Sequence, residues 1–350
     1  MAAPRHTAAA QPGVYDARAP SKGNAITALP GSDRVAQPYS PQAPRSVVAI
    51  RPRAFSVNQQ TAADNAFQSA RIDAEPGEMA RAAYAEVTRV HEVLTGHGVE
   101  VHLFDDLSTG LTPDSVFPNN WFSTHAGGHV AVYPMWSPNR RLERRWDIIE
   151  MLKREYRVQD VIDYSGLEQD GLFLEGTGAM VLDHLDRVAY VCRSNRADPV
   201  ALERFCTHFN FEPIAFDALD DAGRPIYHTN VLMCIGTRFA MAGFDLVVDE
   251  VRRAEIEDRL SDSGRDLIPL TREQVSEFAG NALELEGSHG LILALSTRAL
   301  ASLTSRQVAV IERSASIVPL DVPTIELAGG SVRCMLAGIH LGRRTARPRD

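Results

Sequence analysis

The sequence predicts a five-bladed, pseudo-symmetric α/β propeller of ββαβ units. A cycle of strand, short turn, strand, amphipathic helix and strand recurs along the chain, and the last cycle is incomplete at the C-terminus. The helix and strand that this cycle lacks are predicted near the N-terminus, within residues 79–104. A repeat whose last unit is completed by elements from the other end of the sequence implies a closed ring, because each unit has to bury its face against a neighbour.

The first predicted elements are a strand, a helix and a second strand. Residues 47–50 form a short apolar run that is typical of a strand. Residues 79–97 place apolar side chains at helical spacing, and two glycines end the run. Residues 99–104 alternate as a strand.

Four complete cycles follow. Their first strands are expected at 117–124, 178–183, 230–235 and 282–286; their second strands at 129–133, 187–192, 238–242 and 291–296; their helices near 141–154, after Pro199, at 249–260 and near 305–314; and their third strands at 158–163, 211–216, 266–270 and 316–321. A strand around Cys334 begins the fifth cycle. The structural alternative is a doubly wound sheet, but the many hairpins argue against a mainly parallel sheet.

The amino-acid composition and the net charge limit which kinds of fold and partner are compatible with this sequence. Of 350 residues, 44% are hydrophobic and 23% charged, as in globular proteins with a sizeable core. The net charge of -9 does not indicate the excess of positive charge that is typical of proteins that bind nucleic acid or an anionic membrane. We therefore expect a small-molecule or protein partner, and the sequence leaves a homo-oligomer open.

Two regions are expected. Residues 1–44 are rich in Ala, Pro, Gly, Ser and Gln and predict a flexible, low-complexity tail, whereas residues 45–350 predict a single catalytic domain. The sequence has no apolar run of about 18 residues and no apolar segment typical of a secretory signal near its start. We expect a cytoplasmic protein.

The cysteines and histidines do not predict a metal site. Four cysteines lie far apart, without a C-x-x-C pair, and are expected to be reduced thiols. His125 and His129 have metal-ligand spacing on a helix, but Gly127 and Gly128 lie between them and favour a turn.

If the ring is closed, the loops that enter the first strands converge at one end of its axis. The residues at these entries are Asn119, Asn120, Glu175, His228, Asn230, Asn281 and Cys334. A thiol, an imidazole and a carboxylate would thus meet beside several amides, which supplies a nucleophile, an acid/base and a group that orients substrate nitrogens. Taken singly, Cys334 could be a small buried residue, His228 structural and Glu175 a turn cap.

Seven segments also carry a family resemblance. They are residues 51–68, 116–125, 133–145, 173–183, 227–236, 278–285 and 329–337. Over about residues 47–341 the chain resembles the citrulline-utilisation hydrolases, a group that includes citrulline ureidases. That group belongs to the guanidine-modifying superfamily of arginine deiminase, dimethylarginine dimethylaminohydrolase and the amidinotransferases.

The resemblance implies a catalytic set without metal or organic cofactor. By this match Cys334 is the nucleophile, His228 the general acid/base and Glu175 the catalytic glutamate. The chain departs from the hydrolase pattern at Gly338, where the pattern has a glutamate after Met-Leu-Ala.

Two asparagines bear on the substrate. Where arginine deiminases carry aspartates that grip the guanidinium, this chain has Asn120 and Asn230. A buried carboxylate beside a neutral ligand is an unpaired charge, whereas an amide can donate to a carbonyl and accept from an NH2 group. The substitution favours a neutral ureido group, unless the asparagines merely satisfy loop backbones.

A run of arginines offers a clamp for a substrate carboxylate. Among residues 140–145 we select Arg141, although the run could also be a solvated helix face. Arg333 could serve instead, or could keep the neighbouring thiolate in electropositive surroundings.

The leading hypothesis is hydrolysis of citrulline to ornithine and carbamate through a covalent cysteine intermediate. The second is action on a guanidinium, as a deiminase, a dimethylarginine hydrolase, a dihydrolase or an amidinotransferase. The third is a non-catalytic protein that binds the same ligand, a reading to which Gly338 gives weight.

Overall fold

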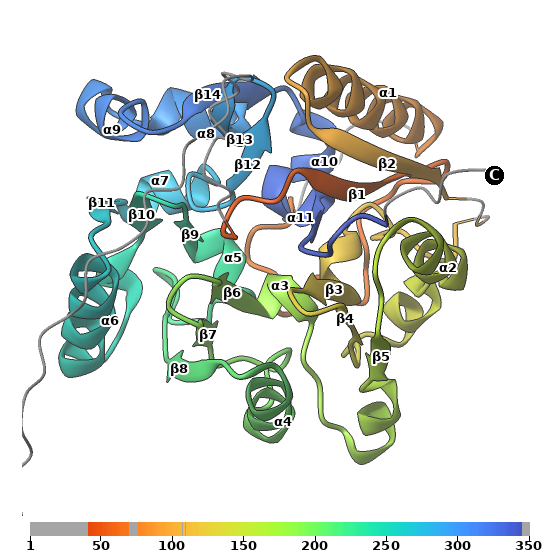
Figure 1. Ribbon diagram of the computed structural model, residues 1–350, viewed down its shortest axis with the longest axis horizontal. Helices are drawn as coiled ribbons and strands as arrows, with labels where there is room; N and C mark the ends of the chain where they lie inside the picture. Colours follow the sequence, from red (N-terminus) through yellow and green to blue (C-terminus); the bar gives the residue numbers. More distant parts are fainter. Residues whose placement is uncertain (1–40, 70–75, 107, 109, 345–350) are drawn as a thin grey trace, which may run out of the picture. The chain divides into compact units, whose positions relative to one another are not determined.

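The computed structural model describes residues 41–69, 76–106, 108 and 110–344. Within them, five three-stranded sheets surround a common centre (Figure 1). In every sheet the first strand pairs antiparallel with the second, and the second pairs parallel with the third. This confirms the predicted five-bladed propeller and excludes the doubly wound sheet.

Each sheet consists of a first, a second and a third strand of the repeating cycle. In that order the strands are β3 (Phe122–His125), β4 (His129–Val132) and β5 (Asp160–Asp163); β6 (Met180–Asp183), β7 (Val188–Cys192) and β8 (Glu212–Phe216); β9 (Met233–Ile235), β10 (Phe239–Ala242) and β11 (Asp266–Pro269); β12 (Leu283–Gly287), β13 (Gly290–Ser296) and β14 (Ser316–Leu320); and β15 (Ala337–Ile339), β1 (Ser46–Arg51) and β2 (Glu100–Asp105).

The fifth sheet closes the ring with strands from both ends of the described chain. Val47 on β1 lies opposite Gly338 on β15 and beside Val101 on β2. Residues more than 200 positions apart in sequence thus share one sheet, as the incomplete last cycle predicts. Burial of the apolar β1 strand between its two neighbours stabilises this closure.

The helices that join second to third strands follow the predicted cycle. They are α2 (Trp146–Glu155), α4 (Pro199–Phe209), α6 (Glu250–Asp262), the pair α8 (Thr297–Ser302) and α9 (Ser305–Ile311), and α1 (Pro76–Gly96). Side-chain caps define several starts: Asp198 accepts from two amides of α4, Asp249 from two of α6, and Thr304 forms a capping box with Gln307 in α9. Short helices α7 (Arg272–Ser276) and α10 (Pro323–Glu326) and the 3-10 turns η3 (Ser165–Asp170) and η4 (Phe244–Leu246) lie in the connections.

The first strands begin later than the sequence predicts. A buried helical turn precedes four of them: η1 (Pro118–Asn120), α3 (Gly176–Ala179), α5 (Thr229–Leu232) and α11 (Val332–Met335). Figure 1 shows α3, α5 and α11 between the sheets, near the centre of the ring. The prediction of a strand around Cys334 is therefore wrong, because Cys334 lies in α11 and the strand starts at Ala337.

The predicted helix near residues 141–154 is divided in two. A 3-10 turn, η2 (Pro138–Glu143), comes first, and α2 starts at Trp146. Arg144 and Arg145 between them have extended backbones, and their guanidinium groups bind Glu168 and Asp147. These ion pairs are tertiary or local side-chain contacts that helical periodicity does not reveal.

The predicted tail lies largely outside the described residues, which start at residue 41. Of its last residues, Gln42, Ala43 and Pro44 are buried. The Gln42 side-chain amide donates to the carbonyl oxygens of Leu182 and Ile235, each at 3.1 Å. The ordered domain therefore extends before residue 45, and its first residues bind the first strands of two sheets.

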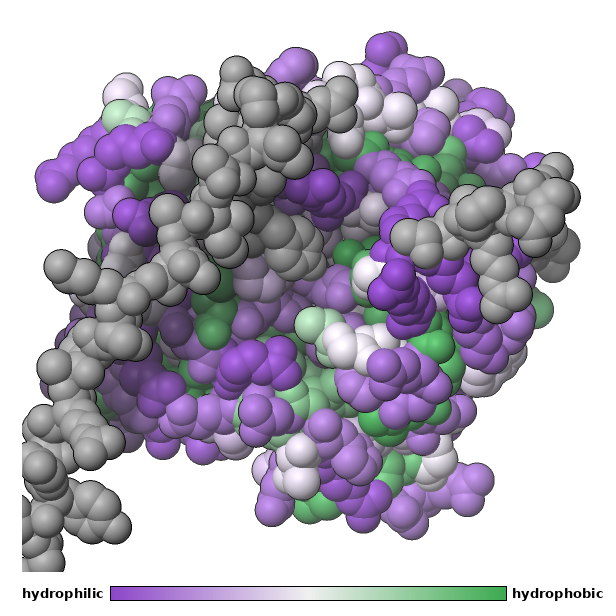
Figure 2. All heavy atoms as spheres, viewed as in Figure 1, coloured by the Kyte–Doolittle hydropathy of each residue, from purple (hydrophilic) through white to green (hydrophobic). Residues whose placement is uncertain are grey.

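Polar and charged side chains cover most of the face shown in Figure 2, with smaller apolar areas between them. Among the described residues, no helix combines the length and the apolar character that a membrane crossing needs.

Candidate active site

Residues of the helical turns η1 and α11, with His228 directly before α5, line one cavity. Residues that precede or form these turns face it, among them Asn120, His228 and Cys334. Of the residues that the sequence predicts to converge, Asn120, His228 and Cys334 line this cavity, whereas Glu175, Asn119, Asn230 and Asn281 do not. Asp114, Arg140 and Arg196 also line it.

Cys334 is held between two amides. Its Sγ atom lies 3.2 Å from the Nδ2 atom of Asn230 and 3.2 Å from the Nδ2 atom of Asn281, and the residue is only 2% exposed. The amides therefore orient the sulfur.

Asn281 also fixes the backbone of the cysteine turn. Its Oδ1 atom accepts hydrogen bonds from the amides of Ser331 and Arg333 at 3.1 Å and of Cys334 at 3.4 Å. These amides lie at the start of α11; that of Cys334 also donates to the Ser331 carbonyl at 3.0 Å, and that of Arg333 to the Asn281 carbonyl at 3.3 Å. One side chain thus caps the turn and contacts the sulfur that the turn carries.

His228 and Glu175 form a buried pair. The Nε2 atom of His228 lies 3.0 Å from the Oε2 atom of Glu175. Burial lowers the pKa of His228 to about 4, although the hydrogen bond and the charge of Glu175 act to raise it. The imidazole is therefore neutral near pH 7. Because Glu175 accepts at Nε2, the neutral ring carries its proton there and leaves Nδ1 as the acceptor.

Glu175 is ionised although it is buried. Burial opposes its ionisation, but Arg196, the hydrogen bond from His228 and Arg140 hold the pKa of its carboxyl well below the usual range. Arg196 and Arg140 place Nη1 atoms 3.3 Å and 3.4 Å from Oε2, and the Trp136 amide donates to Oε1 at 3.0 Å. Protein groups therefore occupy both oxygens of this carboxylate.

The arginine in the cavity is Arg140, one position before the selected Arg141. Arg140 donates to Asn120 Oδ1 at 2.9 Å and pairs with Glu143 and Asp114. The Arg141 guanidinium instead donates to the carbonyl oxygens of Met135 and Trp136 and lies 3.5 Å from Glu168. The sequence could not separate neighbouring arginines in one basic run, since η2 replaces the expected helix.

Arg196 and Asp114 were not identified from the sequence. Arg196 binds Asp64 through Nε at 3.0 Å and Nη2 at 2.6 Å, and this pair holds it against Glu175. Asp114 receives a hydrogen bond from Asn58 on one oxygen, whereas its other oxygen is buried without a partner among the described residues. Each sits alone in a loop, where no periodic pattern marks a single charged residue as functional.

The remaining asparagines differ in their bonding. The Asn120 amide donates to Asn119 Oδ1 at 3.0 Å, whereas the Nδ2 atom of Asn119 is buried without a partner in the described part of the chain. The Oδ1 atom of Asn230 is likewise buried and unpartnered there. A donor and an acceptor thus remain unused beside the groups that line the cavity.

Gly178 in α3 permits the close approach of two site residues. A Cβ atom at this position would lie 2.2 Å from the Nδ2 atom of Asn120 and 2.8 Å from the Nδ1 atom of His228. Both distances are shorter than van der Waals contact, so only glycine fits without displacing these side chains.

Arg333 and Gly338 line a different cavity. It is formed around the first strands of the sheets and shares no lining residue with the cavity of Cys334. Gly338, the departure from the hydrolase pattern, therefore does not remove a group from the space that Cys334 faces.

His125 and His129 are not arranged as a helical metal-binding pair. They face each other across the turn of the β3–β4 hairpin, as the glycines predict. His125 bonds Ser123 Oγ at 2.7 Å and His129 bonds Asp160 at 2.6 Å.

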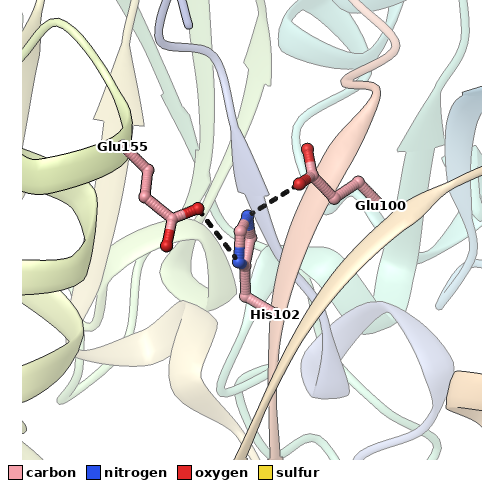
Figure 3. Close-up of side chains that lie close together, drawn as sticks. All are labelled: Glu100, His102 and Glu155. Carbon is pink, nitrogen blue, oxygen red and sulfur yellow. Dashed lines mark ion pairs between the residues drawn. The ribbon is translucent and has the colours of Figure 1, made fainter. Parts of the chain in front are cut away.

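A cluster of Glu100, His102 and Glu155 lies between β2 and α2 (Figure 3). The guanidinium of Arg343 pairs with both carboxylates, and Tyr156 bonds His102 Nε2 at 2.7 Å. Arg343 thus bridges the two carboxylates, between which the His102 ring lies in Figure 3, so the cluster is an ion-pair network that ties the C-terminal segment to α2.

Solved structures share this architecture. The N-terminal domain of ArgZ bound to substrate, described as an arginine dihydrolase from the ornithine-ammonia cycle in cyanobacteria, matches with a TM-score of 0.66 at 16% identity, over 84% of this chain and 97% of that one. AgrE in complex with L-arginine matches with 0.66 at 15%, over 85% and 40%. A dimethylarginine dimethylaminohydrolase adduct with 4-chloro-2-hydroxymethylpyridine matches with 0.57 at 12%, over 85% and 100%. At these identities the likeness establishes the fold.

Comparison of the sequence with curated proteins finds no significant match. A family model does match, over residues 51–341, and this span contains every residue that lines the Cys334 cavity. The chain belongs to the family described as "N,N dimethylarginine dimethylhydrolase, eukaryotic", within the guanidino-group-modifying superfamily.

Proposed function

We propose that this chain is a cysteine-dependent hydrolase that cleaves a C–N bond at the planar terminal carbon of a guanidino or ureido amino acid. The observation that carries the proposal is the placement of Cys334 and His228 on one small cavity, with two amide donors on the sulfur. Family membership supports the same class of reaction.

The first half-reaction uses His228 as a base and then as an acid. Its Nδ1 atom takes the thiol proton while the Cys334 sulfur bonds to the planar carbon. The imidazolium then gives that proton to the departing nitrogen as the C–N bond breaks. The amine leaves, and the carbon remains bound to sulfur as an amidino or carbamoyl thioester-like intermediate.

The second half-reaction restores the enzyme. His228 takes a proton from water, the resulting hydroxide adds to the carbon, and the C–S bond breaks. The proton on His228 returns to the sulfur. Glu175 positions the imidazole through Nε2 and stabilises its protonated form, because its own oxygens are already engaged by protein donors.

Two lines of support favour a guanidino substrate. The family is named for dimethylarginine, and structural relatives are described with arginine as substrate or ligand. In addition, Asp114 lines the cavity with an oxygen that lacks a partner among the described residues, which suits a cationic group of the substrate. That group could be a guanidinium or the α-ammonium of an amino acid.

A second candidate, a ureido substrate such as citrulline, rests on the atoms around the sulfur. The groups that hydrogen-bond to it are the amides of Asn230 and Asn281, not carboxylates. The unpartnered Asn119 donor and Asn230 acceptor lie behind the residues that line the cavity and would complement a carbonyl oxygen and an NH2 group that reached them, whereas a guanidinium offers only donors. This is the citrulline hydrolysis that the resemblance to citrulline-utilisation hydrolases implies.

Product analysis tests both candidates. The purified chain is incubated separately with arginine, dimethylarginine and citrulline, and ammonia, dimethylamine, citrulline and ornithine are measured. Dimethylamine or ammonia from a guanidino substrate supports the first candidate, and ornithine with ammonia from citrulline supports the second. Turnover of neither class, or turnover that Cys334→Ala leaves unchanged, would contradict the proposal and favour a non-catalytic binding protein.

An Asn230→Asp variant separates the two candidates further. It places a carboxylate beside the sulfur and should raise kcat/KM for a cationic guanidino substrate relative to a neutral ureido one. The matched control is Asn210→Asp, since Asn210 ends α4 outside the cavity and its variant should not change the ratio.

A further inference from the structure

A second cavity lies around the first strands of the propeller. It is lined by residues of β3, β6, β9, β12 and β15, one strand from each sheet. A space bordered by all five first strands lies on the axis of the ring. The turn α11 contributes to both axial cavities, Cys334 to one and Arg333 to the other.

The Arg333 guanidinium has no acidic partner among the described residues. Its one side-chain hydrogen bond within them is donated by Nη1 to the carbonyl oxygen of Leu336, at 3.1 Å. A guanidinium has five N–H donors, so most of them remain unused. Arg333 is partly buried, and desolvation lowers the pKa of its guanidinium.

The other polar groups of the cavity do not compensate the charge. His184 and His340 stack there with ring centroids 4.0 Å apart. The neutral His340 ring donates its N–H to the Pro41 backbone, which leaves the His184 ring as the potential donor of the pair. In the part of the chain that the structure describes, no aspartate or glutamate lines the cavity. Glu284, next to the lining residue Leu283 on β12, is not among the lining residues. Its Oε2 atom accepts from the amide and hydroxyl of Thr237 at 2.7 Å and 2.6 Å, and its Oε1 atom is buried without a partner among the described residues.

Other lining groups already have partners. Gln42 uses its amide on two carbonyl oxygens and its Oε1 on the His184 amide, and Thr124 bonds the Gly338 carbonyl at 3.0 Å. The unused polar capacity of the cavity is therefore that of hydrogen-bond donors around a positive charge.

We propose that this axial cavity binds a small oxyanion, a carboxylate or a phosphate, through Arg333 with His184. A planar guanidinium binds two oxygens of such a group at once, and low surrounding polarity strengthens the pairing. Gly338 keeps the space open, since a Cβ there would lie 3.3 Å from His340 Nε2 and 3.0 Å from Pro44. The site is distinct from the catalytic cavity, so it does not depend on the proposed function.

The test is direct binding to the full chain, measured by titration calorimetry with inorganic phosphate and, separately, with acetate. Saturable one-to-one binding of either anion is expected in the wild type. It should persist in Cys334→Ala, which alters only the other cavity. Arg333→Met should weaken it by about tenfold or more, as loss of a charge-assisted contact predicts.

Two further variants keep the test independent of folding. Gly338→Glu retains Arg333 but supplies an internal carboxylate on β15, and it should also abolish binding. Arg313→Met removes one positive charge at an exposed ion pair with Asp266 and should leave binding unchanged. Circular dichroism confirms that each variant is folded.

The proposal is overturned if the wild type binds neither anion, or if Cys334→Ala abolishes binding while Arg333→Met does not. Equal loss in Arg313→Met would also overturn it, because the effect would then be one of net charge. Each of these results leaves the hydrolase proposal unaffected.

Discussion

The Nε2 atom of His228 lies 3.0 Å from the Oε2 atom of Glu175, and both side chains are buried. This contact orients the imidazole so that Nδ1 is its free nitrogen, on the side of Gly178 and Asn120. Proton transfer in the proposed reaction therefore depends on a histidine whose tautomer is fixed by a carboxylate that is itself held by two arginines.

Replacement of Cys334 by alanine should abolish turnover, with a loss of at least about 1,000-fold, because the bond to the substrate carbon forms at its sulfur. The control is Cys206→Ala. Burial raises the pKa of Cys206 to about 12, and this thiol lines neither axial cavity. Steady-state rates test the loss, and mass spectrometry after iodoacetamide treatment at neutral pH should show Cys334 labelled before Cys206. Equal rates of labelling would contradict an activated thiol.

The pH profile should lack an acid limb at the ordinary pKa of histidine. Burial lowers the pKa of His228 to about 4, so the imidazole stays neutral and able to accept the thiol proton as the pH falls through 6.5. We expect kcat/KM to decline only as the pH approaches about 4. Rates measured from about pH 4.5 to about pH 8, with circular dichroism at each pH, test this. A decline centred on the ordinary pKa of histidine would show that the free enzyme does not hold His228 in its buried state.

A Glu175→Gln variant should lower kcat by about 100- to 10,000-fold. The amide cannot stabilise the imidazolium as a carboxylate does, and it leaves Arg140 and Arg196 without a shared anion. Because Glu175 acts to raise the pKa of His228, the acid limb should also move to still lower pH.

The matched control for Glu175 is Glu168→Gln. Glu168 pairs with Arg144 and accepts from the Met135 amide, outside the cavity. It should lower Tm without a comparable loss of kcat. A similar fall in kcat for both variants would mean that Glu175 acts through stability alone.

Asn281 and Asn230 should differ in their effects on stability. Asn281→Ala removes the acceptor of three backbone amides, so unfolding free energy should fall by about 1–3 kcal/mol. Asn230→Ala removes one contact to sulfur and an oxygen without a partner among the described residues, and should cost less. Denaturant unfolding measures both, and activity should fall in each. A larger loss of stability for Asn230→Ala would contradict the capping role of Asn281.

Gly178→Ala should lower activity strongly, although it adds only one methyl group. The new Cβ atom would overlap Asn120 Nδ2 and His228 Nδ1, so the site has to move, at a cost of about 1–3 kcal/mol. Gly166→Ala is the control, because a Cβ atom there would meet no described atom within 4 Å. The test compares the kcat/KM and the Tm of the two variants. Unchanged values for Gly178→Ala would show that the site is loosely packed.

The sequence by itself determined the cyclic order of elements. Hydrophobic periodicity is a local property, so the helix at residues 79–97 and the hairpins near residues 129 and 188 could be predicted from short windows. The ring closure could be predicted because the last cycle lacked a helix and a strand that the N-terminal region could supply. In the structure, β15, β1 and β2 form one sheet in that order. The resemblance named the thiol, imidazole and carboxylate that the fold places near one another.

Only the tertiary structure decided which charged residues reach the cavity. Arg140 rather than Arg141 contacts Asn120, and Arg196 and Asp114 face the same space although each sits alone in its loop. The helical turn of Cys334 depends likewise on Asn281, 53 positions earlier. A local pattern cannot encode such contacts, because the free energy of a buried charge or an orphan amide is set by the groups that the whole ring brings around it.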